Sequence, residues 1–234
     1  MAKPFAYVAY ASYNYYSLRH PATQKLPLTS IGVGTIIHPQ AFITERGVII
    51  GKDCMINAFA IILEHSIIGD NVRIMEGSVI GSESFVRLKV GKHITLRRFR
   101  GGVAIRDRAV VGSHSCIDRA MTSGNTVIGN DSMISSNIHV AHDVRIGRNC
   151  EIRAGAMLAG FMKIDDGAVI GYNSSISNDL TIGEQVLVCP GAVVTKDVPI
   201  KKTVSGNFAI DHLKHRLLMT ENECFEGDTP NETE

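Results

Sequence analysis

The sequence predicts an all-β chain that coils into a parallel β-helix, and three observations predict it. Aliphatic residues recur at every sixth position from Ile128 to Val194 without a break. A small or apolar residue stands two positions before each of them, so both are expected on the same face of a strand. Ile and Val far outnumber Leu, and β-branched residues favour strands. Hexapeptide repeats of this kind are typical of a parallel β-helix.

The same register of six appears in earlier parts of the chain, at Ile31, Ile37 and Ile43, from Ile50 to Ile80, and from Ile105 to Ile117. With three flat faces, one coil takes about 18 residues, and successive coils lie about 4.8 Å apart. Glycine directly follows the aliphatic residue at several turns, and we expect it to permit a tight bend there. These glycines are Gly129, Gly147, Gly171 and Gly183.

Composition divides the chain into three parts. Residues 1–29 hold five of the six tyrosines and are expected to form an N-terminal arm or cap. Residues 30–204 are expected to form the β-helix, with loop excursions near 81–104 and 119–127 where the period breaks. Residues 205–234 are expected to form a short C-terminal helix, because residues 209–219 have helical apolar spacing, followed by a flexible polar tail.

Charge and cysteine content exclude several classes of protein. The chain has 24 Lys and Arg against 23 Asp and Glu, which argues against a dedicated nucleic-acid surface. Its five cysteines form no CxxC pair, and an odd number makes a poor disulfide framework. No apolar run is long enough to span a bilayer, and we see no signal peptide. A cytoplasmic location is therefore expected.

The stretch SSNIHVAHDVRIG, residues 135–147, carries the strongest functional signal. His142 lies two residues past the inward Val140, which predicts a position at a corner of the coil, and Asp143 shares that corner. Eighteen residues on stands Gly160. A neutral imidazole can act as general base, a neighbouring carboxylate can orient it, and a backbone N–H at Gly160 can bind an oxyanion. We therefore predict acyl transfer, with these three residues as the catalytic set.

These residues also carry a family resemblance. NIHVAHDVRIG, followed one coil later by AMLAGFMKI, resembles the hexapeptide-repeat acyltransferases of lipid A biosynthesis, and residues 99–130 look especially like the UDP-3-O-acylglucosamine N-acyltransferase. The resemblance implies a left-handed β-helix and the roles proposed above for His142 and Gly160. It also implies a homotrimer with active sites between subunits, and we expect no counterpart of the family's separate N-terminal uridine domain in the short segment before the repeats.

The resemblance suggests how donor and acceptor would bind. Residues 188–207 look like the end of acetyl-CoA-dependent hexapeptide transferases, which implies that Lys196, Lys201 and Lys202 meet the phosphates of a coenzyme. The donor is expected to be acetyl-CoA, another acyl-CoA or an acyl carrier protein thioester. The acceptor is expected to be a nucleotide-linked amino sugar of surface polysaccharide or lipopolysaccharide synthesis. Candidate substrate-binding residues are Asn137, His139, Asn178, Arg97, Arg98 and Asp118.

Three other interpretations remain. The chain could be the lipid A N-acyltransferase itself. It could also be a metalloenzyme of the γ-carbonic anhydrase type, which uses the same fold and needs three converging histidines. His139 is expected to face outward and His142 to sit at a corner, so we expect no metal site. A non-catalytic β-helix scaffold is the third interpretation.

Overall fold

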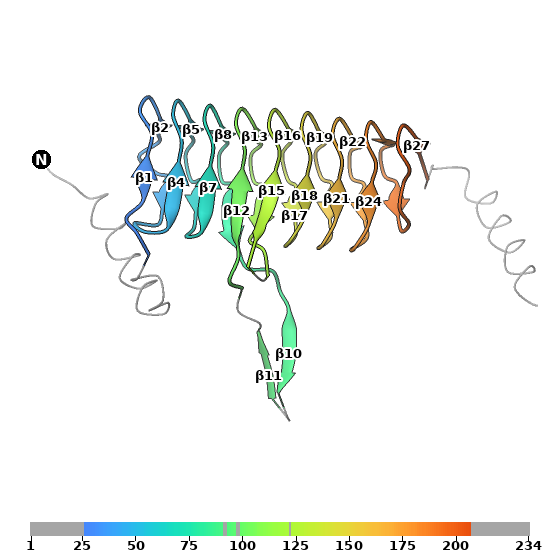
Figure 1. The fold of residues 1–234 in the computed structure, drawn as a ribbon, viewed down its shortest axis with the longest axis horizontal. Helices are drawn as coiled ribbons and strands as arrows, with labels where there is room; N and C mark the ends of the chain where they lie inside the picture. The colour runs from blue at the N-terminus through green and yellow to red at the C-terminus, as the bar shows by residue number, and fades with distance from the viewer. Residues whose placement is uncertain (1–25, 91–92, 97–98, 122, 207–234) are drawn as a thin grey trace, which may run out of the picture.

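The computed structural model describes residues 26–90, 93–96, 99–121 and 123–206, and in them the chain winds as a parallel β-helix with three sheets (Figure 1). The first sheet contains β1 (Ser30–Ile31), β4 (Val48–Ile50), β7 (Ser66–Ile68), β12 (Gly102–Ile105), β15 (Asn125–Ile128), β18 (Arg145–Ile146), β21 (Lys163–Ile164) and β24 (Thr181–Ile182). The second contains β2 (Ile36–Ile37), β5 (Met55–Ile56), β8 (Arg73–Ile74), β13 (Val110–Val111), β16 (Met133–Ile134), β19 (Glu151–Ile152), β22 (Val169–Ile170), β25 (Leu187–Val188) and β27 (Thr203–Val204). The third contains β3 (Phe42–Ile43), β6 (Ile61–Ile62), β9 (Val79–Ser82), β14 (Cys116–Asp118), β17 (His139–Val140), β20 (Met157–Leu158), β23 (Ser175–Ile176) and β26 (Val193–Val194).

The predicted register is confirmed by the strand pairing. Ile146 pairs with Ile164, and Ile164 pairs with Ile182, so residues 18 apart lie on neighbouring coils. Ile105 pairs with Ile68 on one side and Ile128 on the other, which means that the stack continues through both interruptions of the sequence period. The repeat therefore positions residues in space across the whole described β-helix.

The core is the expected column of aliphatic side chains. Ile56, Ile62, Ile74 and Ile152 are among the large side chains that are completely buried, and burial of each stabilises the fold by roughly 1.5–3 kcal/mol. The residues two positions before them also point inward, and Cys54 and Cys150 are examples. Because each inward residue packs against the inward residues of the coils above and below it, the column fixes the position of every corner along the axis of the β-helix.

The role predicted for the glycines at the bends is wrong. The left-handed backbone position lies two residues after them, where Asp131 and Asn149 have φ values of 61° and 53°. Asx side chains tolerate this region better than most residues. At Gly171, an added Cβ would instead lie 2.6 Å from the backbone of Cys189 and Pro190 in the next coil. These glycines therefore allow close stacking of backbones, because they lack a Cβ.

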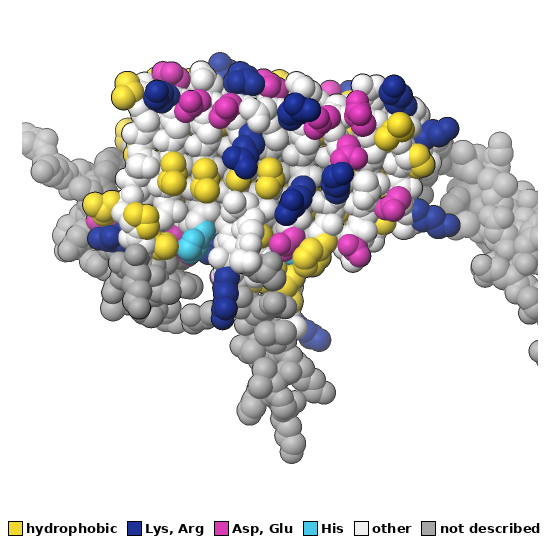
Figure 2. Space-filling model, in the orientation of Figure 1, with side chains coloured by type: hydrophobic (Ala, Val, Ile, Leu, Met, Phe, Trp, Pro, Cys, Tyr) yellow, Lys and Arg dark blue, Asp and Glu magenta, His cyan; other side chains and the backbone are white. Residues whose placement is uncertain are grey.

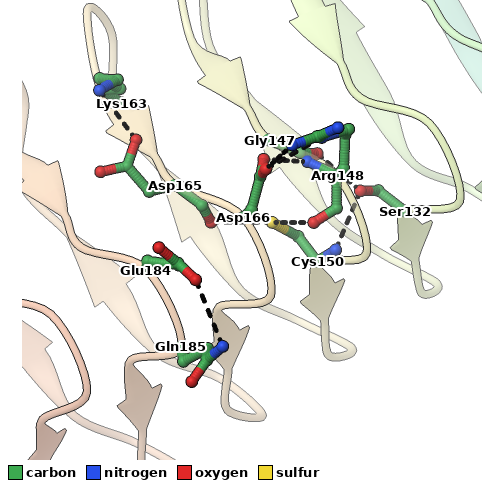
Figure 3. A network of polar contacts seen from close by, with 9 residues as sticks. All are labelled: Ser132, Gly147, Arg148, Cys150, Lys163, Asp165, Asp166, Glu184 and Gln185. Carbon is green, nitrogen blue, oxygen red and sulfur yellow. Dashed lines mark hydrogen bonds and ion pairs between the residues drawn. The ribbon is translucent and has the colours of Figure 1, made fainter.

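Side chains at the edges of the prism tie neighbouring coils together (Figure 3). The guanidinium of Arg148 lies 2.7 Å from a carboxylate oxygen of Asp166, and the backbone N–H of Arg148 donates to the same carboxylate. Ser132 donates to the carbonyl of Gly147 and accepts from the N–H of Cys150. Hydrogen bonds of this kind satisfy the backbone groups that the bends leave without a strand partner.

Both excursions leave the coil at the edge where the third sheet passes to the first. The first begins after β9 and contains an antiparallel hairpin, β10 (Arg87–Val90) and β11 (His93–Leu96), which projects away from the prism (Figure 1). The second lies between β14 and β15. Because both insertions emerge at one edge, they can build a site there.

The proposed division into arm, β-helix and C-terminal helix remains a prediction. The predicted arm falls largely, and the predicted C-terminal helix wholly, outside the described residues. Within the described residues, no helix is long and apolar enough to cross a membrane.

Candidate active site

His142 lies where the sequence predicts, at the edge between the third and the first sheet. We call this edge the His142 edge, and it carries residues 141–144 between β17 and β18. Both excursions emerge from the same edge, one and two coils earlier. The His142 side chain is only 13% exposed, so the imidazole is sheltered by the residues that the excursions bring to it.

Asp143 orients the imidazole. Nδ1 of His142 lies 3.0 Å from Oδ2 of Asp143. The same oxygen accepts the backbone N–H of Met121 at 2.8 Å, and the Asp143 N–H donates to Oγ1 of Thr126. Since an ionised carboxylate can only accept, it selects the tautomer that carries the proton on Nδ1. Nε2 is then left with its lone pair, as a general base requires.

Gly160 stacks directly on this ring. An added Cβ at Gly160 would lie 2.7 Å from Cε1 and 2.9 Å from Nε2 of His142. The neighbouring Phe161 N–H donates to the carbonyl of His142, which locks the two coils together at this point. Within the described part of the chain, the Gly160 N–H donates to no backbone carbonyl. It remains available to an oxyanion beside the base.

Two aromatic rings enclose the imidazole. Phe161, from the next coil, meets the His142 ring edge-on at 4.9 Å, and Phe99, from the end of the first excursion, meets it at 5.5 Å. Phe99 is 5% exposed whereas Phe161 is 48% exposed. The first excursion therefore supplies a wall of the site, and the sequence pattern gave no signal for Phe99.

His139 points outward from β17, as predicted, and is held by Asp118. Its Nε2 lies 2.9 Å from Oδ2 of Asp118. The carboxylate of Asp118 is 4% exposed and also accepts the hydroxyls of Ser82 and Ser84. Asp118 is thus enclosed beneath His139, and the substrate-binding role predicted for it stays a prediction.

The structure separates several of the other predicted residues from His142. Asn137 lies at the edge between the second and the third sheet. Lys201 and Lys202 precede β27, near the carbonyl of Glu184, and belong to the edge between the first and the second sheet. Asn178 and Lys196 do lie on the His142 edge, in the coils above Gly160. Arg97 and Arg98 fall outside the described residues.

Basic residues on the first sheet beside this edge were missed by the sequence reasoning. The outward residues of β4 and β7 are Ile49 and Ile67, but those of β18 and β21 are Arg145 and Lys163 (Figure 2). Arg145 stands three residues after His142. The outward position within each hexapeptide could have identified both residues once the period was known.

No group of three or more His, Cys, Asp or Glu side chains among the described residues could hold a metal ion. His139 and His142 lie close in sequence, but each is hydrogen-bonded to its own carboxylate, Asp118 or Asp143. Both imidazoles are therefore committed to separate acid partners.

Known proteins share both the repeats and parts of the sequence. The bacterial transferase hexapeptide model matches residues 47–82 and 125–160. A UDP-3-O-acylglucosamine N-acyltransferase of Caulobacter sp. strain K31 is 35% identical over 145 residues, which cover 62% of this chain and 42% of that protein. An acyl-carrier-protein–UDP-N-acetylglucosamine O-acyltransferase of Campylobacter concisus is 28% identical over 74% of this chain and 71% of its own length. The chain thus spans about two fifths of the N-acyltransferases that it matches.

Solved structures share the fold. A UDP-N-acetylglucosamine acyltransferase of Francisella novicida superposes with a TM-score of 0.66 at 23% identity, covering 87% of this chain and 73% of that one. The enzyme of the same name from Campylobacter jejuni also gives 0.66, at 21% identity, over 86% and 82% of the two chains. These likenesses confirm the fold class, a left-handed parallel β-helix of hexapeptide repeats.

Proposed function

We propose that this chain is a member of the bacterial hexapeptide-repeat transferases, supported by the matching repeats and the 35% identical relative, and that it is an N-acyltransferase that moves an acyl group from a thioester to the amine of a nucleotide-linked amino sugar. The observation that carries the proposal is the stacking of Gly160 on a histidine whose Nδ1 is held by Asp143. That arrangement leaves a base and an oxyanion donor side by side, which acyl transfer needs and a scaffold does not.

The reaction follows from these groups. A neutral amine attacks the thioester carbonyl carbon while Nε2 of His142 removes one proton from the nitrogen. Asp143 stabilises the imidazolium, and the Gly160 N–H binds the oxyanion of the tetrahedral intermediate. Collapse of that intermediate breaks the carbon–sulfur bond, and the imidazolium returns the proton to the leaving thiolate. The products are an amide and a free thiol, and the histidine is regenerated.

The donor would lie along the His142 edge. Gly160, Asn178 and Lys196 succeed one another on that edge at intervals of one coil, about 4.8 Å each. A thioester with its carbonyl at Gly160 could extend its pantetheine arm past Asn178 toward Lys196, which lines a cavity of about 210 Å³ in the last coils. An acyl-CoA or acyl carrier protein donor has the matching arm and phosphate, and a lysine offers that phosphate a point charge.

Two observations support a nucleotide-linked amino sugar as the acceptor. Relatives of known name act on UDP-linked glucosamine derivatives, and Arg145 and Lys163 give the first sheet beside His142 a basic row that suits phosphate. We favour a nucleotide sugar of surface polysaccharide or lipopolysaccharide synthesis. The lipid A N-acyltransferase activity itself is a second candidate, favoured by the 35% identity to such an enzyme.

We further propose a homotrimer with active sites between subunits, in the cytoplasm. The outward positions of the third sheet carry no Lys, Arg, Asp or Glu in the described strands, and that sheet ends at the His142 edge. Apart from His139, which lies next to the His142 edge, this flat face carries outward side chains without charge, and such a face suits packing against a copy of itself. The four described cysteines are free, which supports a reducing compartment.

The test is a substrate panel. Purified protein is offered nucleotide-linked amino sugars with acetyl-CoA, longer acyl-CoA and acyl carrier protein thioesters, and amide formation is followed by mass spectrometry. We expect turnover with at least one pair and its loss in His142→Ala. The proposal fails if no amine acceptor is acylated by any donor, or if His142→Ala retains wild-type turnover. Matched assays with the hydroxyl analogue of each sugar distinguish amide from ester formation.

A further inference from the structure

A β-bulge aims Asp118 at His139. The pairing of β14 with β9 shifts between Ile117 and Asp118, so that Asp118 lies opposite Ser82. A bulge bends a strand and redirects a side chain. Here it turns the carboxylate toward β17, where Oδ2 meets Nε2 of His139. The remaining acceptor capacity is taken by the hydroxyls of Ser82 and Ser84. The carboxylate is therefore fixed on three sides.

The other ionisable groups near the Asp118–His139 pair are neutral or are bonded to partners of their own. The neighbours of His139 on the third sheet are Cys116 on β14 and Met157 on β20. Burial raises the pKa of the Cys116 thiol, so the thiol stays neutral. The basic residue directly after β14, Arg119, is turned away into an ion pair with Glu64. Beyond Asp118, the ionisable groups on β17 and its corner are His142 and Asp143, which are bonded to each other.

The two histidines are bonded through opposite nitrogens. His142 uses Nδ1 toward its carboxylate and keeps Nε2, whereas His139 uses Nε2 and keeps Nδ1. The hydrogen bond to Asp118 raises the pKa of His139 against the effect of burial. His139 thus holds its proton more readily than an ordinary histidine. A cationic imidazole donates hydrogen bonds and cannot act as a base.

We propose that Asp118 is a positioning residue that holds His139 as a cation on the face next to the His142 edge, where its free Nδ1–H binds a phosphate oxygen of a substrate. This inference rests on the proposed acyl transfer, because it assigns a substrate phosphate as the ligand of His139, beside the proposed base His142. The His139 side chain is 39% exposed, so it can reach a ligand while its partner stays buried. A charge-assisted hydrogen bond to phosphate is among the stronger polar contacts.

The phosphate could come from either substrate, namely the diphosphate of the nucleotide sugar or a phosphate of the thioester carrier. The kinetic arms of the experiment distinguish them. A rise in KM for the sugar alone identifies the acceptor, and a rise in KM for the thioester alone identifies the donor.

The first experiment needs no turnover. The His139 ring is followed by NMR in the full chain while pH is varied and inorganic pyrophosphate is added. In Asp118→Asn we expect the His139 titration to move to lower pH, and the pyrophosphate-induced shift seen in the wild type at pH 7.5 to be lost. Asp131→Asn, which removes a carboxylate from an exposed pair with Arg108, is the matched control and should leave both unchanged.

The second experiment measures kinetics. His139→Gln and Asp118→Asn should raise KM for one substrate by roughly tenfold, with a much smaller change in kcat, because the His142–Asp143 pair is intact. His139→Lys, which restores a permanent cation, should recover most of the loss in KM. Unchanged KM for both substrates in folded His139→Gln overturns the proposal, as does the absence of any pyrophosphate effect on the wild-type ring. If no amino sugar is acylated, the proposed function fails, and the NMR result still decides the role of His139.

Discussion

The imidazole of His142 occupies the space into which a side chain at Gly160 would project. A Cβ there would lie 2.7 Å from Cε1 of the ring, closer than real Cβ contacts come. His142 and Gly160, the proposed base and the proposed oxyanion donor, thus constrain each other sterically, and a change at either position disturbs both.

Gly160→Ala should therefore abolish most activity without unfolding the chain. The ring must shift, and displacement of a reacting group by about 1 Å can cost roughly 100-fold in rate. The measurement is kcat/KM together with a thermal melt. Gly206→Ala is the matched control, because a Cβ there would meet nothing within 4 Å. Wild-type kcat/KM in Gly160→Ala would contradict the assignment.

Asp143→Asn should lower kcat while leaving KM nearly unchanged. The amide preserves shape, but an NH₂ group facing Nδ1 reverses the tautomer and places the proton on Nε2. A comparable substitution in a serine protease triad costs about 10⁴-fold in kcat, and we expect roughly 10²–10⁴-fold here. If kcat stays at the wild-type level in steady-state assays, Asp143 does not orient the base.

Arg119→Met should destabilise the fold strongly. Arg119 and Glu64 form a 3.0 Å ion pair with side chains only 4% and 5% exposed, and Arg119 also donates to the carbonyl of Gly81. Removal of one partner of a buried pair costs about 3–5 kcal/mol, because the other charge is left in the interior. The measurement is urea unfolding.

The control for that change is Arg108→Met. Arg108 forms its pair with Asp131 at the surface, where its side chain is 55% exposed, and such pairs contribute no more than about 1 kcal/mol. The double variant Arg119→Met with Glu64→Leu should recover part of the lost stability. Equal losses for Arg119→Met and Arg108→Met would show that the buried pair has no special role.

The Asp118–His139 pair should make stability depend on pH. Burial alone would raise the pKa of Asp118, but the hydrogen bonds from His139, Ser82 and Ser84 lower it, while the same pair raises the pKa of His139. Stability from Asp118 is lost as pH falls below its ordinary 3.8, and stability from His139 is lost as pH rises above 6.5.

The free energy of unfolding should therefore differ most between wild type and Asp118→Asn in the window from about pH 4 to 6.5. The difference should shrink at pH 9, where the imidazole is neutral. Denaturant unfolding at four pH values across this range measures it. If the stability difference between wild type and Asp118→Asn does not change with pH, no charged hydrogen bond joins Asp118 to His139.

Cys54 and Cys150 should resist alkylation in the folded protein. Burial raises the pKa of both thiols, and each side chain belongs to the core. Because the thiolate is the reactive form, iodoacetamide at pH 8 should label them only after unfolding. Peptide mass spectrometry reads the sites, and Cys189, which is only partly buried, is the internal comparison. Rapid labelling of Cys150 in the native state would contradict its inward position.

Much of the site could be predicted because the six-residue period indicates on which coil a residue lies and whether its side chain points inward or outward. It put Gly160 on His142 and turned His139 outward, and both placements agree with the structure. The period could not place Phe99 or Ser84, since both belong to an excursion whose path the repeat does not determine. It also could not show that a bulge buries Asp118, because a one-residue shift in pairing has no signature in hydrophobic spacing.

The second excursion reaches the site through one backbone group, the Met121 N–H on Asp143, and the first through the Phe99 ring. Apart from these contacts and the Arg119–Glu64 pair, which also spans two coils, each coil packs against the coils beside it, so unfolding can proceed inward from either end. The contacts from the two excursions cross-link three successive coils around His142. Loss of terminal coils should consequently precede loss of catalysis, and the centre of the prism should behave as the last cooperative block to melt.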